Sequence, residues 1–199
     1  MTALRKTSVA LNPDAAPFVI RAERALDVVA REALLDACFG ENRHMRTCQR
    51  LRDGRAPAEG LALSVVHEGR LVGTLRLWHV SAGGIPALVL GPLAVDPSCR
   101  ELGVGAALMN QALAAAKARG HGAVVLLGDA PYYARFGFSG LKTRELSLPG
   151  PFERDRLLGL ELREGALDGA WGMIVPTGAL TQNKASRARK ALRTVPHAA

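Results

Sequence analysis

The chain alternates between short apolar runs and amphipathic stretches, a pattern that predicts strands interspersed with helices. Strands are predicted at residues 18–21, in a hairpin over 61–80, and at 87–95, 123–128, 143–148, 157–163 and 171–175. Helices are predicted at residues 23–40, 42–54, 103–119 and around 131–138. Within the hairpin, Glu68-Gly69 has the turn chemistry of a tight antiparallel connection.

The first predicted helix carries apolar residues three and four positions apart, so one face is expected to be buried. Those residues are Leu26, Val29, Ala30, Ala33, Leu34 and Ala37. Gly40 is expected to end this helix.

Residues 87–95 are apolar almost throughout, which is typical of a central strand that is covered on both faces. Gly91-Pro92 interrupts this run, and proline donates no hydrogen bond to a neighbouring strand, so the strand is expected to bulge or part there. The order strand, helix, strand over residues 87–128 predicts a right-handed crossover and a parallel strand pair. The fold class is therefore α/β, with one mixed sheet and helices on both faces.

The net charge of +8 is unevenly distributed. The stretch 181–199 holds five basic residues and no acid, so a single domain is predicted over 1–180 with a basic tail over 181–199. The tail is read as a solvated segment, either without fixed structure or as a short surface helix. A nucleic-acid partner is not favoured, because no aromatic residues interleave with the basic ones as a stacking surface would require.

Three cysteines, Cys38, Cys48 and Cys99, lack the paired spacing of a metal site, and no metal is expected. No apolar run approaches the roughly 18 to 20 residues that span a bilayer, and no secretion signal is recognised. The prediction is a cytoplasmic protein with no membrane partner.

The sequence "RELGVGAAL" supplies glycines between a strand and a helix, where backbone amides can converge on an anion. A dinucleotide fingerprint does not fit, because Leu108 stands at its third glycine position, and a Walker loop lacks its closing Gly-Lys-Ser/Thr. The pattern Arg/Gln-x-x-Gly-x-Gly/Ala is met by Arg100, Gly103 and Gly105. It fits a diphosphate, and an ordinary glycine-rich helix start is the alternative.

This loop, the interrupted strand and the later "YYARFGF" together resemble the GNAT superfamily of acetyl-CoA-dependent N-acetyltransferases, and within it the bacterial YhbS-like branch. The resemblance covers roughly residues 18–175 and implies a GNAT-type fold with a splayed pair of parallel strands. It also implies acetyl-CoA as co-substrate and an amine as acceptor.

The resemblance places the cofactor-binding residues on two segments. The diphosphate loop falls on Arg100, Glu101, Leu102, Gly103, Val104, Gly105 and Ala106, and the strand that pairs with pantetheine falls on Leu93, Ala94 and Val95. The family's tyrosine falls on Tyr133, which is expected to protonate the departing thiolate as general acid. Its neighbour Tyr132 is the alternative acid and is expected at the cofactor site.

The general base is left open. Many family members keep a glutamate on the central strand, but residues 88–95 contain no carboxylate. The candidates are His79, His44, Glu41 or a water molecule.

Two alternatives to transfer from acetyl-CoA also remain. One is a CoA-binding regulatory or RNA-associated module without transferase activity, and the other is an acyl carrier protein as donor. The acceptor, whether a small molecule, a peptide or a protein amine, is not specified by the sequence, and a homodimer is left open.

Overall fold

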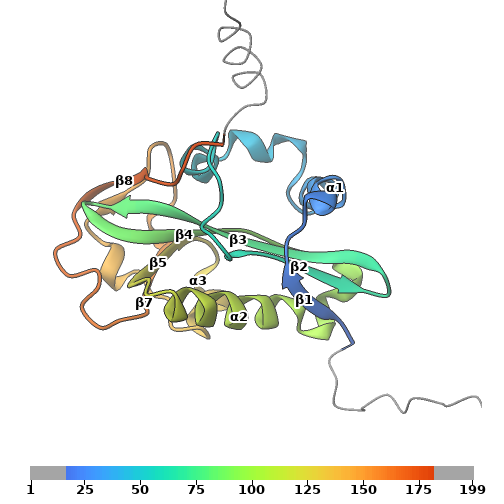
Figure 1. The fold of residues 1–199 in the computed structure, drawn as a ribbon. Coiled ribbons are helices and arrows are strands. Elements are labelled where there is room, and N and C mark those ends of the chain that lie inside the picture. Colours follow the sequence, from blue (N-terminus) through green and yellow to red (C-terminus); the bar gives the residue numbers. More distant parts are fainter. Residues whose placement is uncertain (1–16, 182–199) are drawn as a thin grey trace, which may run out of the picture.

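A computed structural model describes residues 17–181, and the predicted basic tail lies outside them except for Thr181. One eight-stranded sheet runs through the middle of the molecule in the order β1-β2-β3-β4-β5-β7, with β8 pairing β3 and β6 pairing β8 (Figure 1). The strands are β1 Val19–Ala22, β2 Ala62–His67, β3 Arg70–Ala82, β4 Ile85–Val95, β5 Ala123–Leu127, β6 Leu146–Ser147, β7 Leu157–Glu161 and β8 Gly172–Pro176. The helices are α1 Val28–Phe39, α2 Val104–Ala118 and α3 Ala130–Ala134.

The sheet is mixed, as the order of elements predicts. The hairpin of β2 and β3 turns through Glu68-Gly69, and β4 and β5 form the parallel pair. Figure 1 shows α2 along one face of the sheet and α1 on the other. The predicted α/β fold class is confirmed.

Helix α2 covers the larger part of the core. Its fully buried residues pack with apolar side chains of β2, β3, β4 and β5. Gly73 in β3 allows this close approach, because a Cβ there would stand 3.0 Å from a methyl of Val104. Burial of such a continuous apolar surface is the main source of stability in a domain of this size.

The predicted buried face of α1 is wrong. Leu34 is buried, but Val29 is 81% exposed, and Leu26, in the 3₁₀ turn η1 Ala25–Asp27 that leads into α1, is 92% exposed. Asp27 and Arg31 lie on the buried side instead, and both are ion-paired there, so their burial does not leave an uncompensated charge. The helix is therefore rotated relative to the face that the apolar pattern indicates.

The single helix predicted over 42–54 is also wrong. The segment forms two 3₁₀ turns, η2 Glu41–Met45 and η3 Thr47–Leu51, separated by Arg46 in extended backbone (φ −68°, ψ 144°). Side chains of η3 bind carbonyls from a distant loop: the Thr47 hydroxyl donates to Pro151 and Arg50 donates to Pro149. These bonds fix η3 against the loop over residues 149–153.

Candidate functional site

The parallel pair of β4 and β5 parts soon after it begins. Only Leu88 with Val124 and Val89 with Val125 are paired, although β4 continues to Val95. The cause is visible on the other side of β4, where Leu77 faces Leu90 but Leu75 faces Leu93. Between these two pairs β4 advances by three residues while β3 advances by two. β4 therefore carries one extra residue, a β-bulge at Gly91-Pro92, whose peptide bond is cis. The predicted parting of the strand is confirmed.

Beyond the bulge, β4 presents backbone groups to the gap. The Asp96 amide donates to the Val72 carbonyl at 2.8 Å, which makes Gly73 and Val95 a non-hydrogen-bonded pair. The amides and carbonyls of Leu93 and Val95 therefore point away from β3, into the gap beside β5. Ala94 differs, since its backbone faces β3 and its side chain packs with Leu34 and Leu35.

A cavity of ≈ 1050 Å³ opens at this gap. On the sheet side it is lined by residues 90–95 of β4, by Leu127 at the end of β5, and by Gly128 and Asp129 after it. On the opposite side it is lined by residues of η2 and η3 and by the loop over 151–156, which form what we call the helical wall. Sequence reasoning missed this wall, because its segments come together only through the contacts of Thr47 and Arg50 with the distant loop.

The predicted diphosphate loop lies at one end of the cavity. The 3₁₀ segment η4 Pro97–Leu102 leads into Gly103, whose left-handed backbone (φ +74°) starts α2. No side chain caps this helix, so its first amides are free to bind an anion, favoured by the helix dipole. Arg100, Gly103, Gly105 and Ala106 line the cavity.

Three other members of the predicted loop do not line the cavity. Glu101 is exposed, Leu102 is 39% exposed, and the Val104 side chain is buried in the core. Any contact that these three make with a ligand in the cavity would come from their backbone.

The two tyrosines of α3 pack against each other, with ring centroids 4.9 Å apart, and contact different segments around the gap. The Tyr132 hydroxyl lies over the glycine turn, 2.9 Å from the position that a Cβ on Gly105 would take. The Tyr133 ring packs on Gly128 after β5 and edge-on against Phe138. Asp129 caps the short helix: its carboxylate accepts a hydrogen bond from the Tyr132 amide at 3.3 Å. This bond fixes the backbone from which both tyrosine side chains extend. Both tyrosines line the cavity.

Burial raises the pKa of Tyr133 to about 12, and it also raises the pKa of Tyr132. Both phenols are therefore protonated at neutral pH. Among residues 17–181 the Tyr133 hydroxyl has no hydrogen-bond partner. The hydroxyl oxygen is not fully buried. Tyr133 can therefore donate its proton into the cavity.

None of the three base candidates lines the cavity. His79 lies against His121, with ring centroids 5.3 Å apart, and His44 and Glu41 lie on η2 away from the lining. Glu153, which the sequence did not single out, is the carboxylate that lines the helical wall. It is largely exposed and lies 3.5 Å from Arg156.

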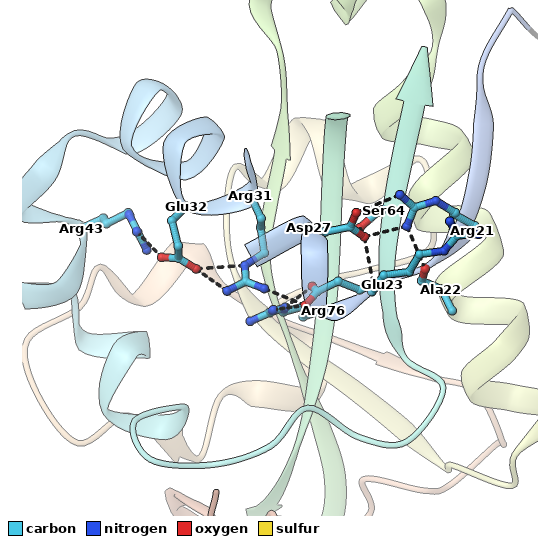
Figure 2. Close-up of polar contacts among 10 residues, drawn as sticks. Arg21, Ala22, Glu23, Asp27, Arg31, Glu32, Arg43, Ser64 and Arg76 are labelled. Atoms are coloured by element: carbon cyan, nitrogen blue, oxygen red, sulfur yellow. Dashed lines mark hydrogen bonds and ion pairs between the residues drawn. The ribbon is translucent and has the colours of Figure 1, made fainter. Parts of the chain in front are cut away.

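A chain of ion pairs ties the helical wall to the sheet (Figure 2). Arg43 on the wall pairs with Glu32 of α1, which pairs with the buried Arg31. Arg31 and Arg76 then share Glu23, and Arg76 lies on β3 opposite the bulge of β4. Because these charges are mostly shielded from water, the pairs hold α1 and η2 in a fixed position over the sheet.

Within the described part of the chain, no group of three or more His, Cys, Asp or Glu side chains could hold a metal ion. None of the helices in residues 17–181 is long and apolar enough to cross a membrane.

The sequence profile described as "Acetyltransferase (GNAT) family" matches residues 28–138, more than half of the chain. The chain belongs to this family of acetyltransferases. A curated relative, the uncharacterized N-acetyltransferase YhbS of Escherichia coli strain K12, is 28% identical over 159 residues, covering 79% of this chain and 95% of its own length. The GNAT resemblance drawn from the glycine loop and "YYARFGF" is thus confirmed.

Solved structures agree with the fold. The crystal structure of E. coli YhbS in complex with CoA is 27% identical, has a TM-score of 0.71, and covers 84% of this chain and 93% of its own. A GNAT acetyltransferase from Brucella melitensis, solved with acetyl-CoA, has a TM-score of 0.56 at 24% identity, covering 86% of this chain and 99% of its own. The second comparison supports the GNAT fold alone.

Proposed function

We propose that this GNAT family member transfers an acetyl group from acetyl-CoA to a primary amine, by direct attack within a ternary complex. The observation that carries the proposal is the continuous cavity between the parted strands β4 and β5, which joins the glycine turn to Tyr133. The complex of E. coli YhbS with CoA supports CoA as the donor's carrier.

The residues present fit such a donor. The free amides before and within the first turn of α2, with Arg100 beside them, suit a diphosphate. The amides and carbonyls of Leu93 and Val95 can pair with an extended amide-bearing arm, as a neighbouring strand would. From Val95 back to Gly91 the strand spans about 13 Å, at roughly 3.3 Å per residue. The thioester would therefore lie near the bulge, in the cavity that Tyr133 also lines.

Acetyl transfer then needs an amine, an oxyanion site and an acid. The lone pair of the neutral amine forms a bond to the thioester carbonyl carbon, and the developing oxyanion is stabilised by the strand amide of Leu93, which of the two free amides lies nearer the bulge. Collapse of the adduct breaks the C–S bond, and the Tyr133 phenol gives its proton to the departing sulfur. The nitrogen loses its extra proton to water in the open cavity, and Tyr133 regains one from solvent.

The test combines binding with turnover. Calorimetry measures acetyl-CoA affinity, and chromatography measures CoA released with a panel of amines, because Cys38, Cys48 and Cys99 are free thiols that would react with a thiol reagent. Tyr133→Phe is expected to lower kcat by about 10² to 10⁴ while leaving the acetyl-CoA Kd unchanged. Tyr132→Phe is the matched control and is expected to affect kcat far less.

A parental kcat in Tyr133→Phe would remove this residue from the mechanism. Tight acetyl-CoA binding with no CoA release from any amine would favour the regulatory alternative. Turnover restricted to an acylated acyl carrier protein would favour that protein as donor.

The pH dependence gives a second check on Tyr133. Its pKa of about 12 keeps the phenol protonated from pH 7 to pH 10, so kcat is expected to show no loss of a catalytic acid in that range. Over the same range kcat/KM is expected to rise as the acceptor, with a reference pKa of about 10.4 for a lysine-like amine, loses its proton. A fall of kcat with a midpoint near pH 9 would contradict the assignment.

We place the reaction in the cytoplasm, where acetyl-CoA is available. A homodimer remains a prediction that the oligomeric state in solution tests.

A further inference from the structure

The helical wall of the cavity carries an arginine whose charge has no acidic partner. Arg52 follows η3, and its Nη1 lies 3.8 Å from the position that a Cβ on Gly91 would take. Its Nε donates to the Cys48 carbonyl at 3.2 Å, which accounts for one of its five N–H groups. Within residues 17–181 no carboxylate lies within 4 Å of this guanidinium.

The other arginines of the wall are engaged. Arg43 pairs with Glu32 and Asp36, and Arg156 lies 3.5 Å from Glu153. Arg46 stacks on the Phe39 ring at 5.2 Å and donates to the Phe39 carbonyl. Arg52 is therefore the guanidinium of this wall that both faces the bulge and keeps its outer N–H groups unused.

Burial lowers the pKa of Arg52, which shows that this charge is poorly solvated by its surroundings. A half-buried guanidinium without an acidic partner is costly, and a planar or tetrahedral oxyanion can accept two parallel hydrogen bonds from it. Such a ligand would supply the missing partner at the place where the fold leaves it open.

The phosphates of the acyl donor are poorly placed to be this partner. They are assigned to the glycine turn at Gly103 and Gly105, beyond Val95, whereas Arg52 lies at Gly91. The intervening strand spans about 13 Å. Arg52 thus belongs to the opposite end of the parted strand, where the acceptor must approach the thioester.

We propose, resting on the acetyl transfer proposed above, that the acceptor is a small amine that carries an anionic oxygen group, a carboxylate or a phosphate, and that Arg52 binds this group. The anion would anchor the acceptor on the wall and direct its amine toward the bulge.

Matched pairs of amines test the proposal. β-Alanine is compared with β-alaninamide, and 2-aminoethyl phosphate with ethanolamine, at saturating acetyl-CoA. The anionic member is expected to have the higher kcat/KM by about tenfold or more, since hydrogen bonds to charged groups are the strong ones. The pair with the larger ratio of kcat/KM, anionic over neutral, shows whether the site prefers a carboxylate or a phosphate.

Variants then assign the preference to Arg52. Arg52→Gln is expected to lower kcat/KM for the anionic member about tenfold or more, to change the neutral member less than about twofold, and to leave the acetyl-CoA Kd unchanged. Arg52→Lys keeps the charge but cannot donate two parallel hydrogen bonds. Its kcat/KM for the anionic member is expected to lie between those of the parent and Arg52→Gln. Arg144→Gln is the control, because Arg144 is exposed and does not line the cavity.

Equal kcat/KM within both pairs, or an equal loss for both members in Arg52→Gln, overturns the proposal. If turnover is too slow to compare, calorimetry measures the Kd of each amine for the CoA-bound protein. An anionic amine that binds no tighter than its neutral partner then also overturns the proposal. Failure of acetyl transfer itself is recognised separately, by the absence of acetyl-CoA binding or by acetyl-CoA binding without CoA release from any amine of the panel.

Discussion

The indole Nε1 of Trp78 donates a 2.7 Å hydrogen bond to the carbonyl of Gly91. Trp78 lies on β3 and is 6% exposed, while Gly91 is the first residue of the bulge in β4. This bond holds the bulged backbone of β4 to a side chain of β3. The geometry of the parted strands therefore depends on a side chain that does not line the cavity.

Replacing Trp78 with Phe removes this bond and leaves the Gly91 carbonyl without its donor. We expect Trp78→Phe to lower the free energy of unfolding by about 2 kcal/mol and to lower kcat/KM about tenfold, because the reacting groups lose their fixed position. Denaturant unfolding and steady-state kinetics measure the two effects. Trp171→Phe is the control, since Trp171 is 73% exposed. A kcat/KM within about twofold of the parent would show that the bulge does not need Trp78.

Gly105 and Tyr132 are expected to be energetically coupled. A methyl at position 105 would stand 2.9 Å from the Tyr132 hydroxyl. The ring cannot move away freely, because it packs edge-on against Tyr133 and lies under the Arg135 guanidinium at 4.5 Å. We expect Gly105→Ala to raise the acetyl-CoA Kd about tenfold, and the added Tyr132→Phe change to restore most of the affinity. Calorimetry on the four proteins of the cycle measures the coupling, and a double variant no tighter than Gly105→Ala would refute it.

Asp27 makes the fold sensitive to acid. Hydrogen bonds from Arg21 hold the pKa of Asp27 well below its usual value, aided by the Arg24 amide and the Ser64 hydroxyl. Since the folded-state pKa is lowered, Asp27 stabilises the fold at pH values above about 4, and this contribution is lost as the pH falls further.

Asp27→Asn is expected to lower the free energy of unfolding by about 2 kcal/mol at pH 7 and by clearly less at pH 3. Urea unfolding at several pH values checks this. Asp155→Asn serves as control, because Asp155 is exposed and its carboxylate has no bond within the described residues. The same loss at both pH values would contradict the assigned pKa.

Thr74 carries a hydroxyl that the fold does not use. Its Oγ1 is fully buried and has no hydrogen-bond partner among the described residues. Its cross-strand neighbour Ser64 is also buried, but donates to Asp27 at 3.0 Å. Thr74→Val is therefore expected to raise the free energy of unfolding by about 1 kcal/mol, whereas Ser64→Ala should lower it by a similar amount. Thermal and denaturant unfolding measure both, and a destabilised Thr74→Val would contradict the account.

How far the sequence alone predicts this molecule depends on whether the determining contacts are local. The bulge at Gly91-Pro92, the glycine turn and the tyrosine pair follow from short motifs, because backbone freedom and missing donors act where they occur. The orientation of α1 does not follow. It is set by Asp27 and Arg31, whose partners include Arg21 on β1 and Glu23 after it, and apolar periodicity gives no weight to buried charged pairs.

The helical wall shows the same limit. Arg52 lies in a segment whose sequence predicts an ordinary helix, and Glu153 lies in a loop with no motif. They meet in one cavity because Thr47 and Arg50 bind carbonyls about a hundred positions later in the chain. The arginine-rich composition of residues 42–54 could have drawn attention to this segment. The sequence gives no sign that Arg52 lacks an acidic partner.

The most direct test of the central claim is a crystal structure of the full chain with CoA. The account predicts the pantetheine arm bonded to the backbone of Leu93 and Val95, its diphosphate on the amides around Gly103 and Gly105, and its sulfur near Gly91 and the Tyr133 hydroxyl. CoA bound elsewhere, with β4 and β5 paired beyond Val89 and Val125, would contradict it.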